Sequence, residues 1–327
     1  MIKFAEYENI PSIMRFIDEH WKKNHILARD RVFFEYQYRM GKKVNFVISQ
    51  ADSGEINGIL GFIPYGKKEK TDIMLALWKV VHTDNPLLGV DLLQFLADHI
   101  NARIIACSGI NKRVMALYQW LGYHVGELIQ WYRLGSRQDY HIAKINNATI
   151  PKVSVEQWSW SEFNTFRDFQ TKFNIAEYSR ETVKPYKEPW YIRHRYFYHP
   201  VYRYRLFGLH QPEGAINTVL VFRVQEYQSA KALRLIDCIG KPDGILHATA
   251  LIDRLLSDTD SEYADVFEVG IPDELLLQAG WIKVSDSGNI IPDYFAPFVR
   301  ENVKIYYCST DSNIVLFKGD GDQDRPS

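Results

Sequence analysis

The stretch IMLALWKVV (residues 73–81), followed by NPLLGVDLLQFL (85–96), decides the fold of this chain. The first segment is a short and almost wholly apolar run, which is typical of a buried strand. In the second segment, Asn85 and Pro86 interrupt the run, and apolar residues then recur at helical spacing. Gly89 lies where that helix begins, and a residue without a Cβ lets the backbone approach a ligand closely. The pattern predicts either a phosphate-binding loop or an ordinary strand-to-helix connection.

The bulk composition describes a globular protein. The chain has 327 residues, 46% of them hydrophobic, and its 39 basic and 40 acidic residues give a formal net charge of −1. This length predicts two domains of average size or one large domain. The near-zero net charge argues against nucleic acid as a partner, and the chain has no run of 18 apolar residues that would predict a membrane span.

The cysteines and acidic residues do not predict a metal site. Cys107, Cys238 and Cys308 are far apart and lack metal-ligand spacing, which argues against a disulfide framework and a zinc site. Together with the N-terminal segment MIKFAEYENI, which lacks the apolar core of a signal peptide, they predict a cytoplasmic location. The tail GDGDQDRPS (319–327) resembles a calcium loop in acid spacing but lacks the loop's full frame and final Glu.

The first half of the chain alternates helical and strand patterns. Segment 24–40 is aromatic and expected to be helical in part, and Gly122 is expected to end a helix. The expected elements are a helix in 8–22, strands at 45–50, 56–65 and 73–81, a helix carrying Leu92, Leu93, Leu96 and Ile100, a strand at 103–108, a helix at 111–121 and a strand at 123–134.

The second half repeats this order of elements after a polar stretch at 135–153, which we interpret as a linker. The ends of the two copies, LYQWLGYHV and ELLLQAGWIKV, both run from helix to glycine, aromatic residue and strand. The expected elements are a helix at 161–173, strands at 203–209, 216–224 and 232–239, a helix at 245–256, a strand at 263–269, a helix at 273–279, strands at 281–285 and 313–318, and a polar tail.

A second motif, SGINKRVMALYQWLGYHV (108–125), follows the glycine-containing segment. Its Asn111 carries an amide that can accept and donate hydrogen bonds. Tyr118 is seven residues later, two helical turns on, so both side chains are expected on one side of the helix. The alternative for Tyr118 is a half-buried ring of the core.

Residues 1–134 resemble the GNAT superfamily of acyl-CoA N-acyltransferases in these two motifs. NPLLGVDL aligns with the family's phosphate-binding loop, Q/R-x-x-G-x-G/A, with Gly89 as its first glycine. Asn85 or Pro86 stands where Gln or Arg is usual, and Asp91 replaces the second small residue. An inward carboxylate would repel a phosphate, so Asp91 is expected to point away from it.

The resemblance implies an α/β (α+β) fold of two tandem GNAT-like lobes, each a twisted mixed sheet flanked by helices. Residues 1–134 would form an acyl-CoA-binding catalytic lobe, 135–153 a linker, and 154–327 a degenerate lobe for acceptor binding or structure. The second copy is assigned this lesser role because Leu276 stands before Gly280 where Tyr118 stands before Gly122.

The resemblance also implies a coenzyme site for acetyl-CoA or another acyl-CoA, without a metal. Strand 73–81 would splay away from its neighbour, and its free backbone groups would hold pantetheine. Tyr118 would protonate the departing thiolate, a general-acid role typically worth 10²–10⁴ in rate. The possible bases are His25, Asp30 and Glu35. The residues expected to bind the coenzyme are Leu77, Trp78, Lys79, Val80, Leu87, Leu88, Gly89, Val90 and Asn111.

An acceptor pocket is predicted from the segment YIRHRYFYHPVYRY (191–204), which mixes Arg, His and Tyr. Such a mixture suits a nucleotide diphosphate whose base stacks on a ring; the alternative is a solvated helix and edge strand. The residues expected to bind the acceptor are Phe33, Tyr36, Arg195, Tyr196, His199, Tyr202, Glu262, Asp265 and Asp293.

The whole chain looks like bacterial proteins of cell-surface polysaccharide synthesis, including O-antigen. This resemblance implies transfer of an acyl group from acyl-CoA, or from an acyl carrier protein, to the amine of a nucleotide-linked amino-deoxysugar. Two alternatives remain: a Fem-type aminoacyl transferase, and a non-catalytic module that binds a sugar nucleotide. The sequence leaves the oligomeric state open.

Overall fold

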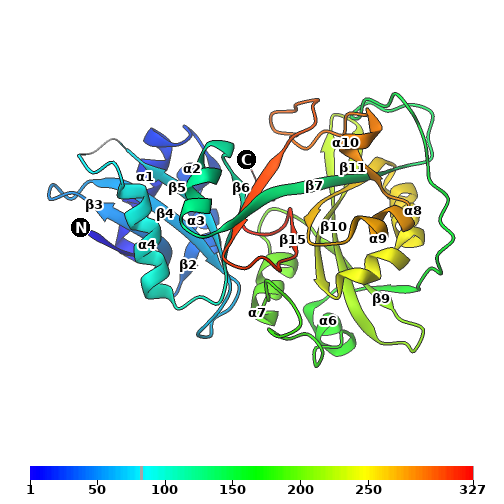
Figure 1. The fold of residues 1–327 in the computed structure, drawn as a ribbon, viewed down its shortest axis with the longest axis horizontal. Helices are drawn as coiled ribbons and strands as arrows, with labels where there is room; N and C mark the ends of the chain where they lie inside the picture. Colours follow the sequence, from blue (N-terminus) through cyan, green and yellow to red (C-terminus); the bar gives the residue numbers. More distant parts are fainter. Residues whose placement is uncertain (82–83, 327) are drawn as a thin grey trace.

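The computed structural model describes residues 1–81 and 84–326, which form one mixed fifteen-stranded sheet flanked by helices (Figure 1). This arrangement confirms the predicted mixed α/β class. The main path of the sheet runs β1-β3-β4-β5-β6-β14-β7-β12-β11-β10-β9-β8, and β2, β13 and β15 pair beside it. None of the described helices is both long and apolar enough to cross a membrane. The three cysteines are free and buried.

The first half matches the expected order closely, although β1 was not expected. The bounds are β1 (Ile2–Glu6), α1 (Ile10–His20), α2 (Ile26–Arg29), α3 (Arg31–Tyr38), β2 (Arg39–Met40), β3 (Lys43–Gln50), β4 (Ile56–Pro64), β5 (Ile73–Val80), α4 (Leu88–Ile100), β6 (Ile105–Ile110), α5 (Met115–Trp120) and β7 (His124–Leu134).

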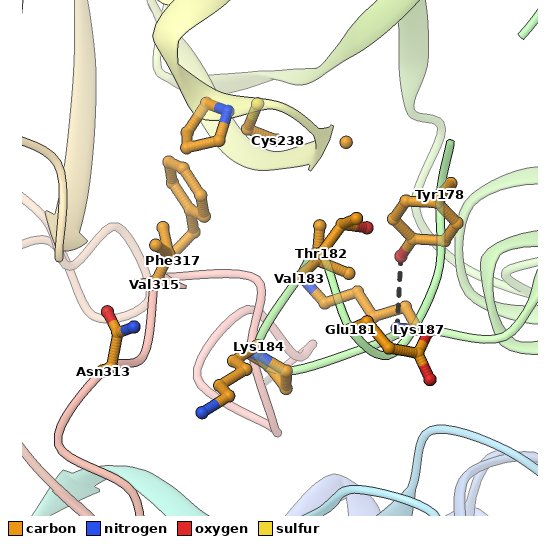
Figure 2. A pocket seen from close by; sticks show the side chains of 13 residues that line it. Tyr178, Glu181, Thr182, Val183, Lys184, Lys187, Cys238, Asn313, Val315 and Phe317 are labelled. Atoms are coloured by element: carbon orange, nitrogen blue, oxygen red, sulfur yellow. Dashed lines mark hydrogen bonds between the residues drawn. The ribbon is translucent and has the colours of Figure 1, made fainter. Parts of the chain in front are cut away.

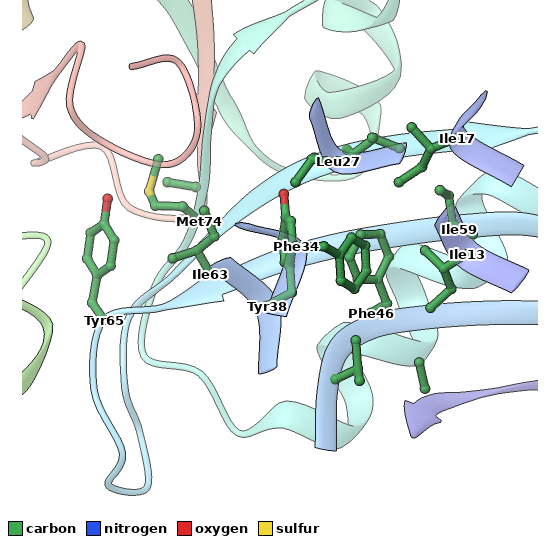
Figure 3. Packing of buried hydrophobic residues seen from close by; sticks show 14 of the residues in the cluster. Ile13, Ile17, Leu27, Phe34, Tyr38, Phe46, Ile59, Ile63, Tyr65 and Met74 are labelled. Atoms are coloured by element: carbon green, nitrogen blue, oxygen red, sulfur yellow. The ribbon is translucent and has the colours of Figure 1, made fainter. Parts of the chain in front are cut away.

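Helices α1–α3 and helix α4 cover opposite faces of this part of the sheet. Strand β3 alternates between the faces, because Phe46 and Ile48 join the core under α1–α3, whereas Val47 joins the core under α4. Figure 3 shows the first core, where Phe34 stacks on Phe46 with ring centroids 5.6 Å apart. The period-2 and period-3.6 patterns of the sequence thus correspond to two separate cores.

The second half also alternates strands and helices, with shorter elements than expected at its ends. The bounds are β8 (Trp160–Glu162), α6 (Phe166–Lys172), α7 (Pro189–Ile192), β9 (Arg205–His210), β10 (Ile216–Tyr227), β11 (Ala230–Gly240), α8 (Thr249–Thr259), β12 (Ser261–Val269), α9 (Asp273–Gln278), β13 (Ile282–Lys283), α10 (Val284–Ser287), β14 (Ile305–Ser309) and β15 (Leu316–Phe317).

Three of the expected elements are wrong in detail. The helix expected at 161–173 begins only at Phe166, because residues 160–162 instead pair with β9 as strand β8. The strand expected at 281–285 shortens to two residues and continues as α10. The strand expected at 313–318 is reduced to β15, and the polar tail that follows is buried rather than solvated.

Strand β7 joins the two halves of the sheet (Figure 1). Its first part, residues 124–128, pairs with β14, and its second part, residues 129–134, pairs with β12. Strand β14, which was not expected from the sequence, lies between β6 and β7. A strand from near the end of the chain therefore completes the sheet of the first half. The predicted domain boundaries at 134 and 154 stay a prediction.

Candidate functional site

Strands β5 and β6 are parallel neighbours that separate along their length. They pair only at Ile73 with Ile105 and at Met74 with Ala106. Beyond these residues, β5 stays paired with β4 as far as Val80, whereas β6 pairs with β14. The splay expected after the start of 73–81 is therefore present, and it leaves backbone groups of β5 without a strand partner.

A cavity of about 600 Å³ opens in this splay. Its volume is that of a typical ligand pocket. It is lined by residues 76–80 at the end of β5, the first turn of α4, residues 107–111 at the end of β6, and α5. Trp21 and three residues of the C-terminal tail complete the wall.

The first turn of α4 presents free amide groups at this cavity. The side chain of Asn85 accepts a hydrogen bond from the N–H of Leu87, and its carbonyl accepts one from the N–H of Leu88. Among the described residues, the N–H groups of Gly89 and Val90 have no acceptor, as expected for a helix N-terminus. The expected phosphate loop is thus the first turn of a helix.

Gly89 packs tightly against β5. A Cβ atom at this position would lie 3.3 Å from Cζ2 of Trp78, so the glycine lets the turn approach the cavity wall closely. Asp91 accepts a hydrogen bond of 2.7 Å from Nδ2 of Asn85 and does not line the cavity, in agreement with its expected direction. Leu87 is exposed and Leu88 is buried in the core, and neither lines the cavity.

Tyr118 and Asn111 line the opposite wall. The Tyr118 ring meets Trp78 edge-on, with centroids 5.6 Å apart, and its hydroxyl lies near the Cys308 thiol. Burial raises the pKa of Tyr118 well above its usual value, so the hydroxyl stays protonated. Asn111 caps the short helical turn before α5 by accepting a hydrogen bond of 2.9 Å from the N–H of Arg113.

The three predicted bases do not line the cavity. His25 caps α2 through Nδ1, and burial, followed by the charge of Arg325, lowers its pKa to about 3. Asp30 caps α3 by accepting a hydrogen bond from the N–H of Phe33. Glu35 forms two ion pairs with arginines of the same segment, and these hold its pKa below the usual value. Their catalytic role stays a prediction.

The sequence analysis missed the C-terminal tail as part of this site. Asp322, Gln323 and Arg325 all line the cavity, and most of the tail is buried. The tail lies along β6, where the Ser108 hydroxyl donates a hydrogen bond of 2.7 Å to the carbonyl of Asp320. The alternating acids of GDGDQD were the available signal, because a buried run of acids requires cationic partners.

Two anchors hold the tail on either side of Asp322. At Asp320, the Lys187 ammonium lies 2.9 Å away and the Tyr65 hydroxyl donates a hydrogen bond of 2.7 Å (Tyr65 is drawn in Figure 3). At Asp324, Arg223 forms a contact of 2.5 Å and the Tyr204 hydroxyl donates a hydrogen bond of 2.7 Å. Burial opposes the charge of Asp324, but Arg223 and Arg195 outweigh it and hold its pKa below the usual value.

A second splay exists between β11 and β12, but the chain itself fills it. These parallel strands pair from Lys231 to Leu235, and β11 then continues to Gly240 paired only with β10. In the gap, Lys318 donates a backbone hydrogen bond of 3.1 Å to Phe267, and Gly319 donates one of 2.8 Å to Ile236. The C-terminal segment therefore hydrogen bonds to both strands and occupies the space between them.

A small cavity, of about 150 Å³, lies beside the end of β11 (Figure 2). Phe317 and Cys238 lie on one side of it, and Lys184 and Lys187 on the other. The buried Lys187 is not free, because it forms an ion pair of 2.6 Å with Asp237. Each half thus contains a splayed pair of parallel strands. Of these two splays, the one between β5 and β6 is the one that leaves a cavity large enough for a ligand of coenzyme size.

The predicted acceptor residues are engaged with each other and with the tail. Tyr36 donates a hydrogen bond of 2.9 Å to the carbonyl of His194, and Tyr196 donates one of 2.5 Å to Asp237. Burial, followed by the charge of Arg195, lowers the pKa of His199 to about 3. The remaining aromatic pair, Phe33 and Tyr202, contacts the ring of His199.

The predicted acceptor carboxylates are also used internally. Glu262 accepts hydrogen bonds from the backbone of residues 141–143 and so fastens the linker to β12. Asp265 and Asp293 share the guanidinium of Arg234, at 2.6 and 3.1 Å. None of the predicted acceptor residues lines the 600 Å³ cavity, and their role stays a prediction.

Solved structures of two proteins superpose on 94% of this chain. A GCN5-related N-acetyltransferase from Anabaena variabilis ATCC 29413 has a TM-score of 0.59 at 12% identity, over 72% of its own chain. A protein from Enterococcus faecalis V583, described as a probable N-acyltransferase, has a TM-score of 0.56 at 9% identity, also over 72%. No protein-family model and no curated protein sequence matches the chain. The chain has the GNAT fold; identities this low show the fold alone.

Proposed function

We propose that the protein is an N-acyltransferase that takes its acyl group from acyl-CoA. The observation that carries this proposal is the open splay between β5 and β6, with the first turn of α4 at its mouth. A helix N-terminus favours a pyrophosphate through its free N–H groups and dipole. The N–H groups of Gly89 and Val90 would bind the coenzyme diphosphate, and unpaired backbone groups within 77–80 would bind pantetheine.

The reaction that fits this site is direct attack of an amine on the thioester. The amine forms a C–N bond to the acyl carbonyl, the C–S bond breaks, and coenzyme A leaves as a thiolate. Tyr118 is the nearest candidate to protonate that thiolate, because it lines the cavity and is held protonated by burial. Its hydroxyl would donate a hydrogen bond to the coenzyme sulfur.

We assign the coenzyme to the first half and a structural or acceptor-binding role to the second, within a tandem arrangement. The filled splay between β11 and β12 supports this assignment, since the chain occupies the place that a second coenzyme would need. Leu276, which is buried in the core of the second half, has no hydroxyl to act as an acid. The proposed acceptor is the amine of a nucleotide-linked amino-deoxysugar for polysaccharide synthesis.

Isothermal titration with acetyl-CoA tests the donor. We expect one molecule bound per chain, because only one splay is open; no binding at millimolar concentration would remove the proposal. Tyr118→Phe should lower kcat by 10²-fold or more with little change in acetyl-CoA affinity. Tyr198→Phe is a matched control, since that ring is exposed. An unchanged kcat in Tyr118→Phe would show that this tyrosine does not protonate the thiolate.

Two other functions give different outcomes in the same assays. Binding of a nucleotide sugar without any release of coenzyme A thiol would favour a binding module. Activity that ribonuclease destroys would favour a Fem-type aminoacyl transferase. Turnover with an acylated phosphopantetheine carrier, but not with acyl-CoA, would assign the donor to an acyl carrier protein.

A further inference from the structure

The cavity between β5 and β6 contains a single carboxylate among its described lining residues, that of Asp322. The other charged residues that line it are Lys79 and Arg325. Asp322 is only 5% exposed. It comes from the C-terminal tail, about 200 residues after the motif that carries Asn111 and Tyr118.

The backbone around Asp322 is held in place at several points. The Tyr65 hydroxyl accepts a hydrogen bond of 2.9 Å from the N–H of Gly321, and the carbonyl of Asp320 accepts one from Ser108. The anchors at Asp320 and Asp324 lie two residues away on either side. A side chain on a segment that is fixed at this many points is held in one position, as a catalytic group must be.

A cation of the same tail holds the Asp322 side chain. Arg325 forms an ion pair with the carboxylate and also lies over the ring of Trp21, 5.2 Å from its centroid. The Asp322 carboxylate lines the cavity, so it can face a ligand bound there.

We propose that Asp322 is the base that accepts a proton from the acceptor ammonium before the amine attacks the thioester. This inference depends on the proposed acyl transfer. One of the two protons lost from nitrogen passes to the Asp322 carboxylate and then to water. The second, lost from nitrogen as the amide forms, replaces the proton that Tyr118 gives to the departing thiolate, so that the coenzyme product is a neutral thiol. The tail thus supplies a catalytic residue to a cavity built by the first half.

Asp322→Asn tests the proposal, because it keeps the shape of the side chain and removes its basicity. With acetyl-CoA as donor and a nucleotide-linked amino-deoxysugar as acceptor, kcat/KM should fall 10²–10⁴-fold. Hydroxylamine, which is unprotonated at neutral pH, needs no base, and its acetylation should change less than tenfold. Acetyl-CoA affinity, measured by titration, should stay within threefold of the original chain.

The controls separate failure of this proposal from failure of the proposed function. Asp286→Asn, on an exposed side chain, should match the unsubstituted protein in every assay. If the unsubstituted protein transfers no acyl group to either acceptor, the acyltransferase proposal fails, and this one falls with it. If it does transfer but Asp322→Asn keeps the amino-sugar rate, or loses both rates equally with intact thermal unfolding, only the assignment of Asp322 is overturned.

Discussion

Gly109 of β6 and Gln323 of the tail approach each other so closely that a side chain on the glycine would collide with the amide. A Cβ atom built on Gly109 would lie 1.9 Å from Nε2 of Gln323. The φ angle of Gly109 is +82°, which also favours glycine. The backbone conformation therefore favours glycine on the strand that forms one wall of the cavity, and any other side chain there would displace the Gln323 amide.

Gly109→Ala should displace the tail and lower acyl transfer. We expect a loss of about 1–2 kcal/mol in the free energy of unfolding from backbone strain alone, measured by urea titration. Gly214→Ala is a matched control, because Gly214 has a φ of +90° and nothing within 4 Å of its Cβ position. A loss of kcat/KM in both variants, or in neither, would contradict a specific role for the Gly109–Gln323 contact.

Gly89→Ala should weaken acetyl-CoA binding about tenfold without destabilising the fold. Alanine is favoured over glycine in a helix by up to about 1 kcal/mol, which offsets the contact with Trp78. Titration calorimetry measures the affinity, and thermal unfolding measures the stability. Ala97→Gly, on an exposed position of α4, is the converse control: it should lower stability and leave affinity unchanged. Equal affinities for Gly89→Ala and the original chain would argue against a coenzyme at this turn.

His25→Asn should make the protein less sensitive to acid. The pKa of His25 is lowered to about 3 in the folded state, so between pH 6.5 and 3 the unfolded chain binds a proton that the folded chain does not. Stability is then lost as pH falls through this window, on the order of 1.4 kcal/mol per pH unit. Asparagine can keep the cap of α2. Urea titrations at several pH values should show a shallower slope in the variant.

The comparison for His25 is His20→Asn, at an exposed end of α1, whose stability should follow the original pH dependence. The same variants test the predicted base. Full acyl-transfer activity in His25→Asn would leave Asp322 as the better assignment. A large loss of activity with an intact fold would instead support His25 as the base.

Glu268→Gln should stabilise the protein at alkaline pH. Burial is the main reason that the pKa of Glu268 is raised to about 7, despite hydrogen bonds from Ile271 and Trp131. Between pH 4.5 and 7 the folded state therefore holds a proton that the unfolded state releases, and stability falls as pH rises. The total loss is at most about 3 kcal/mol.

Thermal unfolding at pH 5 and pH 8 checks this expectation. Glu268→Gln should gain stability relative to the original chain only at the higher pH. Glu226→Gln, on an exposed side chain of β10, should show no such gain. A variant that is destabilised equally at both pH values would show that the hydrogen bonds matter more than the buried charge.

The sequence determined the elements of the first half because their patterns are local. The apolar run at 73–81 and the helical spacing after Gly89 identified β5 and α4, and Gly122 marked the end of α5 through its positive φ of 86°. The helical segment with Asn111 and Tyr118 was likewise predicted from its local pattern. These are properties of neighbouring residues, for which spacing along the chain is sufficient evidence.

The tertiary structure alone decided how the two halves are joined and which splay stays open. The pairing of β14 between β6 and β7 links residues almost 200 positions apart, as Tyr307 with Ser108 shows, and no local pattern encodes such a partner. The sequence identified the tail only as polar, because its cationic partners, Lys187, Arg195 and Arg223, lie far away in sequence. Burying those charges together is favourable only when the whole chain has folded, and this is what carries Asp322 into the cavity.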